Sequence, residues 1–208
     1  MTSIKSSARN CAVLVLLPCA LVALTSHSAS AQIKSPRAHT HYGVELEPHL
    51  VVQWADEPYY RDTGIGVGLR ASIPVIEDGP VSTINNSLAI GFGLDWAHFD
   101  DCGPFNDLCD ADNFWFPLVV QWNFFLTKSI SLFGEFGLAL QYARLGWAGD
   151  VPVNCVRVNG VDVCRGDVDD LDVELVLWLG ARFAISENIA FTLRLGTPSL
   201  LFGVSFLL

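Results

Sequence analysis

Strict alternation of large apolar residues with small or polar ones recurs along this chain and constrains its fold more than any other feature. Residues 87–99 illustrate the pattern. Their even positions are Leu88, Ile90, Phe92, Leu94, Trp96 and His98, and their odd positions are Ser87, Ala89, Gly91, Gly93, Asp95, Ala97 and Phe99. A period of two places alternate side chains on opposite faces of an extended strand. The pattern therefore predicts strands with one oily face and one small or polar face.

Eight segments of 8 to 14 residues show this alternation: 42–54, 64–73, 87–99, 114–126, 129–142, 172–185, 189–196 and 199–208. A tilted strand needs roughly 9 to 11 residues to cross a bilayer. The bulky face is nearly unbroken in every segment, and the opposite face combines glycine, alanine and serine with isolated charges. A soluble barrel or sandwich would bury its oily face, whereas a narrow membrane barrel needs small residues inside. The prediction is an all-β fold, an eight-stranded antiparallel up-and-down transmembrane β-barrel.

Two prolines lie inside these predicted strands, Pro48 and Pro117. Proline lacks the backbone N–H that a strand ladder uses, so its usual places in a sheet are edges and bulges. We therefore expect a bulge or a local distortion at each of these positions.

The first 31 residues have the features of a cleaved secretory signal peptide. Lys5 and Arg9 precede an apolar run at 11–24, and small residues follow up to Ala31. The run has 14 residues and contains Pro18, which is too short for a membrane-spanning helix of roughly 20 residues. Cleavage before Gln32 would leave 177 residues with a net charge of −12, because two of the 12 basic residues are removed and all 22 acidic ones are kept.

The lengths of the connections predict which end of the barrel faces out. We expect a periplasmic N-terminal segment at 32–41, a barrel at 42–208, and external loops at 55–63, 100–113, 143–171 and 197–198. Two of the three periplasmic turns are then minimal and two external loops are long, as is usual for such barrels. Outward-facing aromatic residues form two girdles in this topology. The external girdle holds Trp54, Trp96, Phe114 and Tyr142, and the periplasmic one holds Tyr42, Trp122, Phe124, Phe183, Phe191 and Phe206.

These features resemble the small outer-membrane β-barrel proteins of Gram-negative bacteria, the eight-stranded OmpA, OmpX and OmpW-like group. The final alternation also looks like the signal that such proteins present to the barrel-assembly machinery, with Leu200, Phe202, Val204, Phe206 and Leu208 on one face. The resemblance implies location in a bacterial outer membrane, contact with its lipids and lipopolysaccharide, and assembly by that machinery. A net charge of −10 argues against nucleic acid as a partner, because phosphate binding needs a basic face.

Four cysteines remain after the signal peptide, and all fall in predicted external loops. Residues 155–164 form a hairpin centred on Asn159 and Gly160, a strong two-residue turn signal that places Cys155 opposite Cys164. This register predicts a disulfide there, since exported proteins keep cysteine pairs oxidised, and Cys102 to Cys109 follows by elimination. Zinc is the competing interpretation, but neither pair has knuckle spacing and no histidine lies in these loops.

Acidic residues also gather in the predicted external loops, which hold 13 of the 22 carboxylates. Clustered carboxylate oxygens favour hard cations, so divalent cations shared with lipopolysaccharide phosphates are one interpretation. A solvated, self-repelling loop surface is the simpler one. The run at 167–172 lacks the glycine and the terminal glutamate of a calcium-binding EF-hand loop.

The inferred lumen face carries nine charged or titratable residues: Glu45, Glu47, His49, Arg70, Asp95, Glu135, Glu174, Arg182 and Arg194. Such groups must be paired or hydrated in a narrow interior. A salt-bridged plug and an ion-filtering constriction both fit this pattern. Registers across long loops cannot be derived from the sequence, so no pairs are assigned.

The sequence predicts a non-enzymatic outer-membrane barrel without a cofactor, whose external loops serve envelope structure or surface interaction. A narrow porin-like channel for small ions or solutes is the alternative. A lipid-A-modifying barrel enzyme is a third possibility, for which His98 lies near the external edge and is followed by Asp100 and Asp101. That chemistry also needs an adjacent nucleophile, and no serine stands beside these residues.

Overall fold

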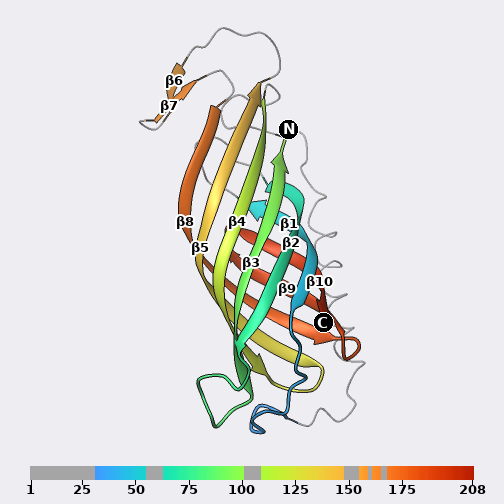
Figure 1. The fold of residues 1–208 in the computed structure, drawn as a ribbon. Coiled ribbons are helices and arrows are strands. Elements are labelled where there is room, and N and C mark those ends of the chain that lie inside the picture. Colours follow the sequence, from blue (N-terminus) through green and yellow to red (C-terminus); the bar gives the residue numbers. More distant parts are fainter. Residues whose placement is uncertain (1–30, 55–62, 101–108, 148–154, 159–160, 165–167) are drawn as a thin grey trace, which may run out of the picture. The chain divides into compact units, whose positions relative to one another are not determined.

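Eight antiparallel strands close into a barrel in the computed structural model, which describes residues 31–54, 63–100, 109–147, 155–158, 161–164 and 168–208 (Figure 1). The barrel strands are β1 (Glu45–Trp54), β2 (Thr63–Ile76), β3 (Asn86–Phe99), β4 (Cys109–Phe125), β5 (Ile130–Trp147), β8 (Val168–Ala184), β9 (Ile189–Thr197) and β10 (Ser199–Leu207). Each pairs with its neighbours along the chain, and β1 pairs with β10 to close the barrel. No helix among the described residues is long and apolar enough to cross a membrane.

The predicted fold class is confirmed, and each predicted segment overlaps one barrel strand. The predicted loop limits need correction, because β4 already begins at Cys109, β5 ends at Trp147 and β8 begins at Val168. The apolar alternation ends where outward-facing residues become polar, as at Asp112 and Arg144. The alternation marks only the part of each strand whose outer face contacts lipid. Strand pairing continues past them, since Asp112 still lies opposite Arg144. Backbone hydrogen bonding does not require an apolar face.

The stagger of the strands follows from one row of paired residues around the barrel. The row runs from Leu171 through Tyr142, Phe114, Trp96, Val67, Leu50, Phe202 and Leu193 to Ala181. It returns to β8 ten residues further along the strand, at 181 instead of 171. An eight-stranded barrel with such a stagger has strands tilted by roughly 40–45° from its axis. At that tilt the nine-residue strands β9 and β10 span most of a membrane's apolar layer.

Burial alternates with a period of two along the strands, as in β1, where every second residue is buried. The exposed positions are mostly large and apolar; β8 alone exposes Leu171, Val173, Leu175, Leu177 and Leu179. The buried positions are largely polar, charged or small. This arrangement is the inverse of a water-soluble protein, and it gives the barrel a lipid-facing exterior.

The two prolines inside strands interrupt the ladder without shifting its register. Pairing of β1 with β10 passes from Leu46 opposite Phe206 to His49 opposite Gly203, and pairing of β3 with β4 omits the position of Pro117 in the same way. A register shift occurs instead in β2, between Pro74 and Ile76. Each proline therefore causes the expected local distortion, an interrupted ladder, but no bulge, because proline removes one ladder donor while its backbone still fits an extended strand.

A short hairpin of β6 (Cys155–Val158) and β7 (Val161–Cys164) forms a separate two-stranded sheet. Its register pairs Cys155 with Cys164 and Val158 with Val161, as the sequence predicts. The side chains of this hairpin, residue 102 and the side chain of Cys109 lie outside what the structure describes. Both disulfides thus remain predictions.

Candidate functional site in the barrel interior

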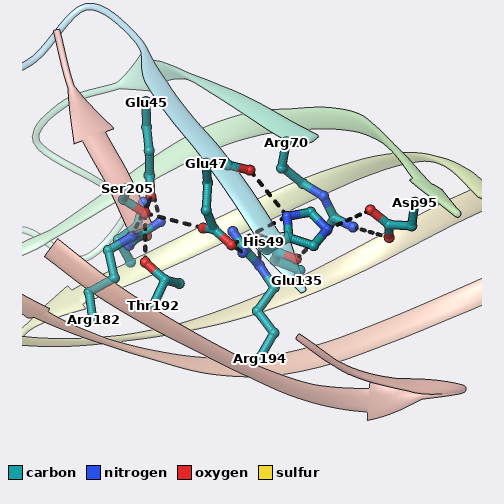
Figure 2. Close-up of polar contacts among 11 residues, drawn as sticks. Glu45, Glu47, His49, Arg70, Asp95, Glu135, Arg182, Thr192, Arg194 and Ser205 are labelled. Carbon is teal, nitrogen blue, oxygen red and sulfur yellow. Dashed lines mark hydrogen bonds and ion pairs between the residues drawn. The ribbon is translucent and has the colours of Figure 1, made fainter. Parts of the chain in front are cut away.

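A connected set of ion pairs occupies the barrel interior (Figure 2). The structure buries eight of the nine residues predicted for the lumen: Glu45, Glu47, His49, Arg70, Asp95, Glu135, Arg182 and Arg194. The ninth, Glu174, is half-buried, and its side chain makes no hydrogen bond or ion pair among the described residues. Figure 2 shows the eight buried groups pointing toward one another, and they come from six different strands.

One end of this network is a bidentate pair between Arg182 of β8 and Glu45 of β1. Arg182 Nε donates to Glu45 Oε1 at 2.7 Å, and Arg182 Nη2 donates to Glu45 Oε2 at 2.7 Å. Arg182 Nη1 donates to Asn123 Oδ1 at 2.8 Å, and the Ser205 hydroxyl donates to Glu45 Oε1 at 2.6 Å. Paired N–H donors match a carboxylate in both geometry and charge. The pair ties two strands that lie far apart in the sequence.

Glu135 of β5 lies between two arginines at the centre of the network. Arg70 Nη1 donates to Glu135 Oε2 at 3.0 Å, and Arg194 Nε donates to Glu135 Oε1 at 3.1 Å. Arg194 Nη1 also pairs with Glu47 Oε1. Each of these carboxylates therefore has a cationic partner although it is removed from water, which is the condition for keeping a charge buried.

His49 and Asp95 complete the network on its other side. Arg70 Nη2 donates to Asp95 Oδ2 at 2.9 Å, and His49 Nε2 lies 2.8 Å from Asp95 Oδ1. His49 Nδ1 lies 3.1 Å from the carbonyl oxygen of Glu47. A carboxylate and a carbonyl both accept hydrogen bonds, so each ring nitrogen of His49 faces an acceptor.

Aromatic faces hold the arginines on the side that the carboxylates leave open. Phe133 lies 4.3 Å from the guanidinium carbon of Arg182 and 4.9 Å from that of Arg194, and Trp178 lies 4.8 Å from that of Arg70. Such cation–π contacts fix the plane of the guanidinium group. Phe133 packs on Gly180, where an added Cβ would lie 2.1 Å from its ring. The small lumen residues thus make room for the large ones.

An apolar cluster adjoins the charged network inside the barrel and consists of Trp115, Val119, Ala139, Val176 and Trp178. A cavity of about 420 Å³ lies at the predicted periplasmic mouth, where Tyr42, Phe125, Lys128, Arg182 and Glu187 are among its lining residues. Of the eight buried network residues only Arg182 lines this cavity. The cavity therefore ends where the network begins.

The segment before β1 folds over the same mouth. The backbone N–H of Gln32 donates to the carbonyl of Leu126 at 2.7 Å, and the His39 ring stacks on Phe125 with 4.2 Å between centroids. Tyr42 is predicted to join the outward-facing periplasmic girdle, and this prediction is wrong. It precedes β1, lines the cavity and hydrogen-bonds Glu45; burial and the negative charge of Glu45 raise the pKa of its phenol.

At the opposite, predicted external end, His98 contacts two carboxylates. Its Nδ1 lies 3.0 Å from Asp112 Oδ1, which also accepts from Trp96 Nε1 at 2.9 Å, and its Nε2 lies 3.5 Å from Asp100 Oδ1. Residue 101 lies outside the described residues. In the part of the chain that the structure describes, no group of three or more His, Cys, Asp or Glu residues could hold a metal ion.

Sequence reasoning on charges alone missed several members of the network. Asn123, Thr192 and Ser205 each lie between two large apolar, outward-facing residues of their strands, and this alternation was the available signal. Phe133 and Trp178 give a different signal, since each is a large aromatic residue on a face that otherwise carries small and polar side chains. The specific pairs depend on register between strands and had no signal in the sequence.

The sequence matches no protein-family model and no curated protein. Solved structures do match. The chain is similar to Ail, the attachment invasion locus protein of Yersinia pestis, with a TM-score of 0.50 and 12% identity over 80% of this chain and 99% of that one. It also matches the outer membrane protein OprG from Pseudomonas aeruginosa, with a TM-score of 0.48 and 10% identity over 81% and 96% of the two chains. At such identities the likeness to Ail concerns the fold, which is that of a small outer-membrane barrel.

Proposed function

We propose that this outer-membrane β-barrel is a non-enzymatic protein with a sealed interior, which acts in envelope structure or surface interaction through the parts it presents outside the membrane. The proposal includes disulfides Cys102–Cys109 and Cys155–Cys164 in the external loops. It also includes contact with outer-membrane lipids and with lipopolysaccharide, whose phosphates share divalent cations with the acidic loops. Assembly by the barrel-assembly machinery is a further part of the proposal. Ail is named for attachment and invasion, and a comparable surface role is proposed here from the geometry of this chain.

The observation that carries the proposal is the paired network across the interior. Glu135, Arg70 and Arg194 are fully buried, both arginines donate to Glu135, and the adjoining Trp178 is buried as well. Removing one partner of such a set would leave a charge in a medium of low polarity, which is costly. A solute could cross only by displacing several of these pairs together. The interior therefore supports a structural plug better than a conducting path.

A narrow channel is the second candidate, and the cavity at the periplasmic mouth is the feature that favours it. The cavity has room for a small solute, but its floor includes Arg182, whose guanidinium is held by Glu45 and Asn123. The enzyme hypothesis has a separate test. Lipid A from cells with and without the protein should have the same mass spectrum.

Planar-bilayer recording tests the proposal directly. We expect the folded wild-type barrel to show no reproducible single-channel current. The matched control is the double variant Glu47→Ala with Arg194→Ala, which removes both sides of one ion pair, keeps the charge balance and opens space in the interior. Single-channel current through the double variant would show that the ion pairs in the interior are what prevents current through the wild type. Reproducible wild-type currents whose ion selectivity changes in Glu135→Gln would overturn the proposal in favour of the channel.

A further inference from the structure

The cavity of about 420 Å³ at the predicted periplasmic mouth has a wall that three parts of the chain build for the most part. They are the segment before β1, with residues between 32 and 42, the chain between 125 and 131 at the turn from β4 to β5, and the chain between 182 and 190 at the turn from β8 to β9. Sites for small molecules commonly have volumes of roughly 300–1,000 Å³. The cavity therefore has the size of a ligand site, and the proposed surface role leaves it unused.

The wall of this cavity continues from the barrel interior onto the outer face. Ser131 and Arg182 lie opposite each other, are buried and face the interior. Ile130 and Ile185 also line the cavity but belong to the outward-facing series, since Ile130 pairs with the exposed Phe183 and Ile185 is itself 61% exposed. A ligand in the cavity can thus contact interior polar groups and lipid-facing side chains at the same time.

Aromatic residues place the cavity at the level of the lipid headgroups. The outward-facing Trp122 and Phe124 have rings 4.8 Å apart, and Phe124 lies opposite Leu132, two residues along β5 from Ile130. Aromatic rings gather where the apolar layer of a membrane meets its headgroups. The head of a lipid in the leaflet at this end of the barrel therefore lies at the depth of the cavity.

Arg182 and Lys128 give the cavity its strongest hydrogen-bond donors. Arg182 is neutralised by Glu45, and three of its five N–H groups bond Glu45 and Asn123, which leaves two further N–H groups. Lys128 is exposed on the turn from β4 to β5 and forms no ion pair among the described residues, so its positive charge is uncompensated. An anionic group in the cavity would gain hydrogen bonds from Arg182 and charge attraction from Lys128.

Glu187, the third charged residue among the described lining residues, restricts the charge of a ligand. Lys128 and Arg182 carry two positive charges and Glu187 one negative charge, a net charge of +1, whereas the whole chain carries −10. A carboxylate brings one negative charge, but a phosphate monoester brings about −1.5 to −2 at neutral pH. The lining therefore favours a carboxylate over a phosphate monoester.

We propose that this cavity binds the carboxylate end of a single-chain fatty acid, taken from the membrane leaflet at this end of the barrel. Lys128 attracts the carboxylate, and Arg182 and Ser131 donate hydrogen bonds to it. The hydrocarbon chain leaves the cavity past Ile130 and Ile185 and enters the apolar layer. The inference goes beyond the proposed function, because it concerns the end of the barrel opposite the external loops.

The competing explanation is that the cavity holds only water and that fatty acids meet the barrel only as part of the surrounding bilayer. Photo-labelling of the mature barrel in phosphatidylcholine vesicles distinguishes the two. The probe is dodecanoate with a diazirine on its chain, and mass spectrometry locates the attachment. Phe125 lines the cavity opposite Ser131, whereas Leu138 faces lipid. The ratio of label at Phe125 to label at Leu138 therefore separates binding in the cavity from partition into the bilayer.

We expect the label at Phe125 to saturate and to be displaced by excess dodecanoate. Dodecanol has the chain without the charge, and acetate has the carboxylate without the chain, so neither should displace the label at the same concentration. Ala184→Phe fills the cavity and should abolish labelling at Phe125. These arms test separately whether the charge, the chain and the space are each required.

Charge variants test the roles of the two turns. Lys128→Gln should lower the labelling ratio by about fivefold, and Glu187→Gln should raise it by about twofold. The matched control is Lys34→Gln, which changes the other lysine that remains after signal cleavage. Lys34 is exposed and lies outside the lining, so this variant should label like the wild type.

Several outcomes would overturn the inference. They are an absence of label at Phe125, a ratio that is the same in Lys128→Gln and the wild type, and displacement by dodecanol or acetate as effective as that by dodecanoate. If Ala184→Phe fails to fold, the charge variants and the competitors still decide the question. A barrel that is silent in bilayers and takes up no dodecanoate would refute this inference alone, whereas a conducting wild type would refute the proposed function.

Discussion

Replacing Glu135 with glutamine is expected to lower the free energy of unfolding of the barrel by about 3–5 kcal/mol, the usual range for breaking a buried ion pair. Glu135 accepts hydrogen bonds from Arg70 at 3.0 Å and from Arg194 at 3.1 Å. Glutamine keeps the size of the side chain but removes its charge, and its amide group can point a donor at a second donor. The positive charges of Arg70 and Arg194 are then balanced by one buried carboxylate fewer. Urea unfolding from lipid vesicles, followed by tryptophan fluorescence, measures the change.

Glu174→Gln is the matched control for this experiment. Glu174 lies on the same lumen face but is only half-buried and has no partner among the described residues. Its replacement should change the free energy of unfolding by no more than about 0.5 kcal/mol. Equal losses in the two variants would mean that pairing at Glu135 contributes nothing specific.

Replacing Leu179 with arginine is expected to cost about 2–4 kcal/mol, as for a charge on the lipid-facing side of a barrel near the bilayer midplane. Leu179 is 68% exposed on the outer face of β8, well inside the part of the strand that β9 covers. In a water-soluble protein a leucine this exposed would tolerate arginine with little change. The same unfolding experiment in vesicles therefore distinguishes lipid from water around this residue.

Leu171→Arg provides a depth control on the same face of the same strand. Leu171 is 64% exposed and lies on the part of β8 that extends beyond the end of β9. The expected cost there is about 0–1 kcal/mol, because the side chain lies near or above the interface. A similar cost at both positions would contradict the placement of the strand across the membrane.

Much of this architecture could be predicted because its signals are local. Alternation in segments such as 87–99 is a property of neighbouring residues, and it predicted the strands and the faces that they turn inward. The Asn159–Gly160 turn signal in the sequence likewise predicted the register that pairs Cys155 with Cys164. In these cases the residues that interact lie within a few positions of one another.

Other features depend on register across the whole barrel and had no local signal. Glu45 and Arg182 are 137 residues apart, and Glu47 and Arg194 are 147 apart, so their pairing follows only from the closed sheet. The extension of β4, β5 and β8 beyond the apolar alternation was missed for a different reason. Alternation reports where side chains contact lipid, whereas the backbone ladder continues into water. Tyr42 was misassigned because the alternation includes it although β1 begins three residues later.

Resistance to unfolding in detergent gives the most direct test of a closed membrane-spanning barrel. The mature chain, folded into lipid vesicles and applied to an SDS gel without heating, should migrate differently from the same sample after boiling, and its circular dichroism spectrum should be rich in β-structure. The difference in migration is expected because the eight-stranded sheet has no open edge through the membrane and is closed by pairing of β1 with β10. A mature chain that stays in water as a monomer, and that migrates identically before and after boiling, would contradict the fold, its location and the proposed function together.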